Sequence, residues 1–107
     1  MLVKSQYKTN DIICFRITTG EEIVAKLKIE DPHTYTVIKP LALVNGPKGV
    51  HMVPAMVTVD QTAEIVYNKS AIISTSTPTK AVEGSYTQNT TGLVMATTGD
   101  SSKLKAN

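Results

Sequence analysis

The chain has 107 residues, which is the size of a single domain with one modest hydrophobic core. Hydrophobic residues make up 41% of it and charged residues 19%, as in soluble globular proteins rather than disordered or membrane-spanning chains. The formal net charge of +2 is too small for a protein that binds nucleic acid through its overall charge, so only a local basic patch stays open.

Residues branched at Cβ dominate the composition. Thr, Val and Ile supply 35 of the 107 residues (15, 11 and 9). Such side chains suit a pleated strand better than a helix, and no segment shows a sustained apolar period of 3.6 residues. The composition therefore predicts an all-β protein.

The single cysteine, Cys14, lies in an apolar run. One thiol excludes an intrachain disulfide and a zinc site of the CxxC type, so we expect a small buried hydrophobe. The start, MLVKSQYKTND, lacks the apolar core of a signal peptide, and no apolar stretch is long enough to span a bilayer. We therefore expect a cytoplasmic protein without membrane contact, in the host cytoplasm if a phage encodes it.

The first predicted strand, IICFRIT, covers about residues 11–18 and places Ile13, Phe15 and Ile17 on one face. The segment TTGEE follows, in which Gly20 can take the positive φ of a tight hairpin. These features predict a hairpin that leads directly into a second strand.

That second strand, IVAKLKIE, covers residues 23–30, and apolar side chains recur at every second position from Ile23 to Ile29. A period of two predicts one buried and one solvated face of a sheet. The apolar face holds Ile23, Ala25, Leu27 and Ile29, and the polar face holds Lys26, Lys28 and Glu30.

Turn signals separate the remaining strands. Asp31 and Pro32 form a turn before a strand at about 34–44, and NGPKG turns the chain into an extended run at about 50–59. Together these two runs predict a long hairpin at about 38–59. The last two core strands are EIVYN (64–68) and AIISTST (71–77).

Beyond Pro78, the segment TKAVEGSYTQNTTG is typical of a poor, short helix or a loop. We expect residues 1–98 to form one domain with a C-terminal extension, and residues 99–107 to form a flexible polar tail. Short strands between tight turns predict a sandwich or a small barrel.

The segment ITTGEEIVAKLKIEDPHTYTVIKPLAL resembles the first motif of the Sm and Sm-like family. In that motif a glycine closes the first hairpin, and a small residue, a leucine and an aspartate follow. Gly20, Ala25, Leu27 and Asp31 occupy these places in order. The family often has glycine where this chain has Ala25.

The segment YNKSAIISTSTP resembles the second motif of Hfq, the bacterial Sm-like family. Ile73 is one extra residue, and Asn68 and Ser70 stand where Hfq has tyrosine and histidine. The long middle hairpin and the C-terminal extension are similar to those of small Sm-like proteins of tailed phages. The matching residues are Lys69, Ala71, Ile72, Ser74 and Pro78.

The resemblance implies a strongly bent, five-stranded, SH3-like open barrel that forms a homo-oligomeric ring of five to seven chains. It also implies single-stranded RNA binding near the ring's opening. Tyr35 would stack on a base, Lys69 would meet a phosphate, and Asn68 and Ser70 would contact base edges or phosphate. Two alternatives stay open for these residues: a cross-strand aromatic at Tyr35 that covers the barrel mouth, and an ordinary polar turn at 68–70.

A second function stays open from a different class, namely a structural or assembly protein, of phage origin for example, that uses the barrel for protein contacts alone. We expect no enzyme, metal or cofactor. His33 and His51 are the only histidines and have no third ligand at metal spacing. NGPKG lacks the spacing of a phosphate-binding loop, and no nucleophile stands in a catalytic context.

Overall fold

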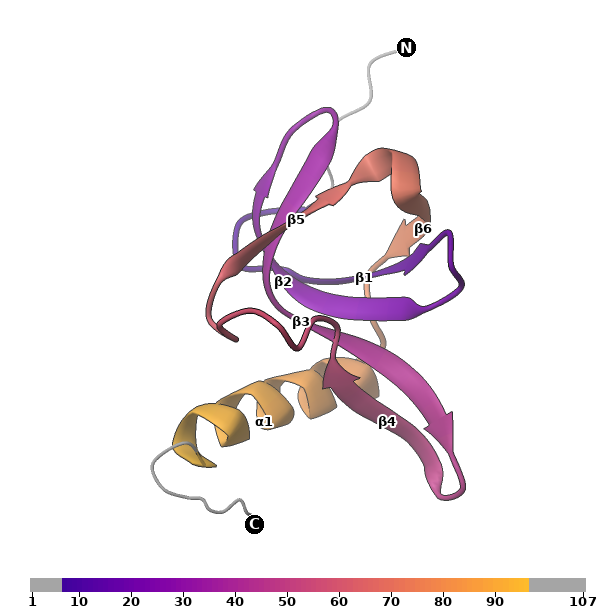
Figure 1. The fold of residues 1–107 in the computed structure, drawn as a ribbon, viewed down its shortest axis with the longest axis vertical. Helices are drawn as coiled ribbons and strands as arrows, with labels where there is room; N and C mark the ends of the chain where they lie inside the picture. The colour runs from indigo at the N-terminus through magenta and orange to yellow at the C-terminus, as the bar shows by residue number, and fades with distance from the viewer. Residues whose placement is uncertain (1–6, 97–107) are drawn as a thin grey trace.

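The computed structural model describes residues 7–96, and the side chains of residues 7–91, as a mostly β fold with one C-terminal helix (Figure 1). All six extended runs predicted from the sequence form strands. The prediction of five strands is therefore wrong by one. The elements are β1 (Ile12–Ile17), β2 (Glu22–Glu30), β3 (Thr34–Gly46), β4 (Gly49–Pro54), β5 (Glu64–Asn68), the 3₁₀ helix η1 (Lys69–Ala71), β6 (Ile72–Ser76) and α1 (Lys80–Ala96).

The six strands form one open antiparallel sheet. Its order is β4-β3-β2-β1-β6, and β5 pairs with β3 off this path. The first half of β3 pairs with β5 and its second half pairs with β4, so the predicted long hairpin leaves the rest of the sheet halfway along β3 (Figure 1). Gly20 has a φ of 104°, which confirms the tight turn predicted between β1 and β2.

A bulge in the β2–β3 ladder marks the point where β3 changes partners. Val24 pairs with Leu41 and Lys26 with Ile38, so Lys39 and Pro40 together oppose one residue of β2. Lys39 has a φ of 51°, a left-handed conformation that is uncommon for a residue with a side chain. Packing around this bulge has to hold the backbone in place.

The main core lies on one face of the sheet, where Phe15 and its neighbours from β1, β2 and β3 pack together. The inward face predicted for β2 is confirmed for three of its four residues, and the inward face of β1 is confirmed at Ile13 and Phe15. The buried residues of this cluster are Ile13, Phe15, Ile23, Ala25, Leu27, Tyr35, Val37 and Ala42.

The fourth predicted core residue of β2, Ile29, is 57% exposed, so that prediction is wrong. Leu27 pairs with Val37 and Ile29 with Thr36, which leaves Lys28 as one extra residue in β2. A one-residue bulge turns every following side chain to the opposite face. Ile29 therefore points to solvent, and Glu30 pairs with the buried Tyr35.

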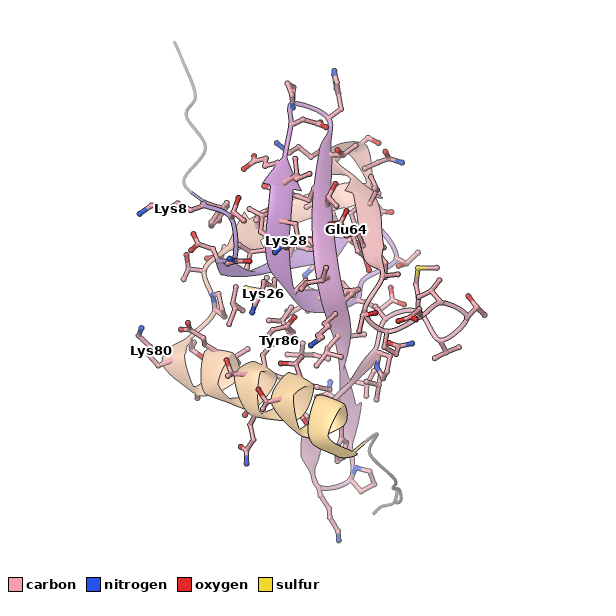
Figure 2. The ribbon with its side chains drawn as sticks, turned by 90° about the vertical axis from the view of Figure 1, so that its left-hand side faces the viewer. Lys8, Lys26, Lys28, Glu64, Lys80 and Tyr86 are labelled. Carbon is pink, nitrogen blue, oxygen red and sulfur yellow. The ribbon has the colours of Figure 1, made fainter. Side chains whose placement is uncertain are left out.

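The alternation in β2 predicted that the opposite face of the sheet is solvated. Part of that face is buried instead. Val24 is fully buried there together with Leu41, because α1 covers them with Tyr86. Figure 2 shows Tyr86 between the helix and the sheet, on the side where Lys26 and Lys28 emerge. A second, smaller core thus holds the helix against the bulge.

The sequence predicted a short helix or a loop after Pro78, and the structure has a helix there. Helix α1 has 17 residues and is therefore longer than predicted. The Thr79 hydroxyl accepts the Val82 backbone N–H at 3.1 Å and caps the first turn. Val82, Tyr86 and Thr90 are spaced four residues apart along one side of the helix. Val82 and Tyr86 pack against the sheet, and Thr90 is buried with its hydroxyl bonded to the Tyr86 carbonyl. One of these three is a threonine, so the sequence shows no apolar period.

Cys14 is half-buried rather than buried, which corrects the prediction of a small core hydrophobe. Its thiol donates a hydrogen bond to the Ser76 carbonyl at 3.3 Å, across the β1–β6 pair. The tail predicted at 99–107 lies outside the described residues. Within those residues, no helix is long and apolar enough to cross a membrane.

Candidate functional site

The three polar residues of the second motif lie where β5 passes through η1 into β6. Asn68 ends β5, and the Lys69 N–H donates to the His33 carbonyl at 2.8 Å. The Ala71 carbonyl accepts the Thr18 N–H at 2.9 Å. The segment is therefore tied to both the β2–β3 turn and the β1–β2 turn, which fixes its backbone on the sheet.

The Lys69 ammonium points back into the molecule. Its Nζ lies 2.6 Å from Oε2 of Glu30 and 4.8 Å from the ring centroid of Tyr35. Both ends of the ion pair are half-buried. The positive charge is thus shared between a carboxylate and an aromatic face, and is not offered to solvent as a free phosphate ligand.

Tyr35, the residue expected to stack on a base, is 6% exposed. Its ring packs parallel to Phe15 at 6.2 Å between centroids, and Phe15 meets Tyr67 edge-on at 5.0 Å. Lys69 lies over the ring from another side. Tyr35 thus pairs with Tyr67 across the strands, as its structural alternative expected, but it lies in the core and leaves little ring surface for a base.

Asn68 and Ser70 lie on either side of Lys69, and both side chains are exposed. His33, whose carbonyl binds the Lys69 backbone, is exposed as well. The structure therefore brings an amide, a hydroxyl and an imidazole to one end of the sheet, while Lys69 turns inward. These three exposed groups can donate and accept hydrogen bonds.

The aspartate of the first motif has a structural place beside this segment. The Asp31 carboxylate accepts the backbone N–H groups of His33 and Thr34 and the Thr34 hydroxyl, each at 2.8 Å. The bond from the His33 N–H, followed by those from Thr34, lowers the pKa of Asp31 below its usual range. Asp31 thus fixes the turn whose carbonyl at His33 holds Lys69.

The strands on both sides of η1 each leave one edge unpaired among the described residues. β5 pairs with β3, β6 pairs with β1, and the two strands do not pair with each other. Val66 on β5 is 59% exposed and Ile73 on β6 is 62% exposed. β6 carries no charged residue, so nothing electrostatic blocks its edge.

Ile73 is an extra residue in the ladder between β1 and β6. Arg16 pairs with Ser74 and Ile17 with Ile72, which leaves Ile73 unpaired as a bulge in β6. The bulge explains why an isoleucine within a strand is turned to solvent.

Sequence reasoning missed Glu30 as the partner of Lys69. The two residues are 39 positions apart, and no motif connects them. The strand register does connect them, because Glu30 pairs with Tyr35 and Tyr35 pairs with Tyr67, two residues before Lys69. Across the described chain, no three His, Cys, Asp or Glu side chains are grouped so that they would hold a metal ion.

No protein-family model matches the chain, and no curated protein matches it closely enough to count as a relative.

Proposed function

We propose that this chain is a ring-forming, Sm-like assembly module. The β5 edge of one copy pairs with the β6 edge of the next, and five to seven copies close a ring. Within each copy, the sheet curls around the Phe15 cluster as a strongly bent barrel. Pairing of two different edges is heterologous, and a heterologous contact closes into a ring when its rotation permits.

The two free edges on either side of η1 carry this proposal, and each strand presents one large exposed apolar side chain, Val66 on β5 and Ile73 on β6. An edge strand without charged residues, such as β6, is a template for pairing with another chain. Within one chain these two edges do not satisfy each other, because β5 pairs only with β3 and β6 only with β1 among the described residues. A second copy supplies the missing edge on each side, and Val66 and Ile73 lose solvent exposure in the contact.

A role in protein assembly fits the geometry better than a role in RNA binding. The two strongest RNA ligands expected from the sequence are engaged inside the chain, Lys69 with Glu30 and Tyr35 with Phe15. Single-stranded RNA binding remains a second candidate because Asn68 and Ser70 are exposed. A ring would repeat these two groups around its opening.

Charge placed on one edge tests the proposed ring. Ile73→Lys puts an ammonium on the free β6 edge, and Ile29→Lys is a matched control, since Ile29 is similarly exposed on the interior strand β2. We expect light scattering to show a ring-sized mass for the wild type and for Ile29→Lys, and its loss in Ile73→Lys. An unchanged mass in Ile73→Lys would contradict the use of this edge.

A further inference from the structure

The β3–β4 hairpin presents a third free edge that the proposed ring does not use. β4 is the terminal strand of the sheet and pairs only with β3 among the described residues. Its six residues pair in unbroken register, from Leu41 with Pro54 to Gly46 with Gly49. The strand has no bulge, lysine or carboxylate, and its only proline is at its end. Natural sheets commonly block an exposed edge with such features.

Exposed apolar side chains concentrate on this hairpin and on the segment that follows it. Five of the eight large hydrophobic residues exposed in the described chain lie here, and Val50 on β4 is 60% exposed. No carboxylate occurs between residues 32 and 59. The exposed apolar side chains of the hairpin lie on both of its faces, beside its free edge, which favours a contact along that edge. The five residues are Val44, Val50, Val53, Met56 and Val57.

We propose that β4 pairs in antiparallel fashion with β4 of a second copy, so that the two sheets continue into each other across a two-fold axis. Each copy contributes the same strand, so the contact is self-complementary. The pairing satisfies backbone groups on both edges and removes Val50 and Val53 from water.

The charge distribution favours a second copy in the antiparallel orientation. The one ammonium at the hairpin tip belongs to Lys48, directly before β4. Antiparallel pairing puts the two Lys48 residues at opposite ends of the paired strands, roughly 20 Å apart at about 3.3 Å per residue. That distance is about twice the screening length in physiological salt, so the two like charges hardly oppose the contact.

The proposed ring would strengthen this contact without being required for it. The rotation axis of a ring makes the β3–β4 hairpins of all its copies equivalent. Two such rings related by two-fold axes would therefore pair every hairpin of one ring with a hairpin of the other. Several weak contacts made at once bind far more tightly than one. If no ring forms, the same pairing still predicts a dimer.

Mass measurements on the full chain separate the two contacts. We expect the wild type to have about twice the mass of the double variant Val50→Lys/Val53→Lys. Ile73→Lys should be a dimer held by the β4 contact alone. The triple variant, which combines Val50→Lys, Val53→Lys and Ile73→Lys, should be a monomer. Thr87→Lys/Gln88→Lys, which adds the same charge on exposed positions of α1, should keep the wild-type mass. A monomeric Ile73→Lys, or equal masses for wild type and Val50→Lys/Val53→Lys, would overturn the β4 contact and leave the ring untouched.

Crosslinking tests the geometry independently of the mass. When two strands pair around a two-fold axis, opposite residues share a face, so the residue at the axis faces its own copy. For a strand of residues 49–54 that residue is His51 or Met52. In a Cys14→Ser background, either His51→Cys or Met52→Cys should therefore form a disulfide with its own copy under mild oxidation, because opposite Cα atoms are about 4.5–5.5 Å apart. Equal crosslinking of both variants and of Thr87→Cys would contradict the pairing.

Discussion

The Lys69 ammonium lies 2.6 Å from the Glu30 carboxylate and joins the segment between β5 and β6 to the end of β2. The same ammonium covers the ring of Tyr35, which belongs to the main core. The backbone of Lys69 is held at the same place by the His33 carbonyl. These contacts therefore help to fix the free edges of β5 and β6 relative to the rest of the sheet. Lys69 thus has a structural role that does not depend on a ligand.

Replacing Lys69 with methionine should lower the free energy of unfolding by about 1–3 kcal/mol, because it leaves a half-buried carboxylate without its ammonium. Glu30→Gln in the same background should show a coupling energy of about 1 kcal/mol in a double-mutant cycle. Lys80→Met is the control, since the Lys80 side chain is 99% exposed beside Glu83. Its effect should stay below about 0.5 kcal/mol. Equal effects of the two lysine variants in urea unfolding would contradict a structural role for Lys69.

Tyr86→Phe should destabilise the protein by about 1–3 kcal/mol, although it removes a single oxygen. The Tyr86 hydroxyl lies 2.9 Å from the Lys39 carbonyl and 3.2 Å from the Ile38 carbonyl, and it also bonds to the Lys26 backbone. These backbone groups belong to the β2–β3 bulge, where the regular ladder is interrupted. Thr87→Ala, at an exposed position of α1, is the control for thermal unfolding. A Tyr86→Phe variant as stable as that control would show that the hydroxyl does not hold the bulge.

Alkaline pH should destabilise the protein through the same tyrosine. Burial raises the pKa of Tyr86 from its usual 10.0 to about 12. Between these values the folded chain keeps the proton and the unfolded chain loses it, so stability falls as pH rises through this window. Burial also raises the pKa of Tyr7 and Tyr67, which contributes in the same direction. Denaturant unfolding at several pH values above 9 should show a shallower decline for Tyr86→Phe than for wild type. Parallel curves would contradict this assignment.

If the ring binds single-stranded RNA, the exposed polar groups should carry the contact. Asn68→Ala and Ser70→Ala should each weaken binding of oligo-U or oligo-A by about 2–10-fold, as expected for the loss of one hydrogen bond. Affinity should also fall steeply with salt, because phosphate contacts release counterions. Fluorescence anisotropy with labelled oligonucleotides measures both effects. If wild type binds neither oligonucleotide even at low salt, the RNA role fails and the assembly role remains.

The strands could be predicted from the sequence because their signals are local. The alternation in β2, the turn glycines and the Cβ-branched runs each act over a few residues, and six strands form where these signals place them, although β4 ends at Pro54 and not at residue 59 as predicted. The errors arise at bulges. One extra residue at Lys28 turns Ile29 outward and brings Glu30 toward the core face, which no pattern of alternation reveals.

The candidate site was harder to predict because its chemistry depends on contacts that are distant in the sequence. The second motif drew attention to Asn68, Lys69 and Ser70, and the structure places them in one bend in which Asn68 and Ser70 are exposed and Lys69 is turned inward. The motif could not indicate that Glu30 holds Lys69, since only the pairing of β2, β3 and β5 brings the two together. Helix α1 was equally hidden, because a tyrosine and a threonine form most of its buried stripe.

Native mass spectrometry of the full chain, across protein concentrations, examines self-assembly through the β5 and β6 edges. We expect closed species whose masses are whole multiples of 11.5 kDa, with five to seven chains in a ring or twice that number where two rings pair. Ile73→Lys should lose these species and Ile29→Lys should keep them. A wild-type protein that stays a monomer of 11.5 kDa at every concentration would contradict the proposed ring.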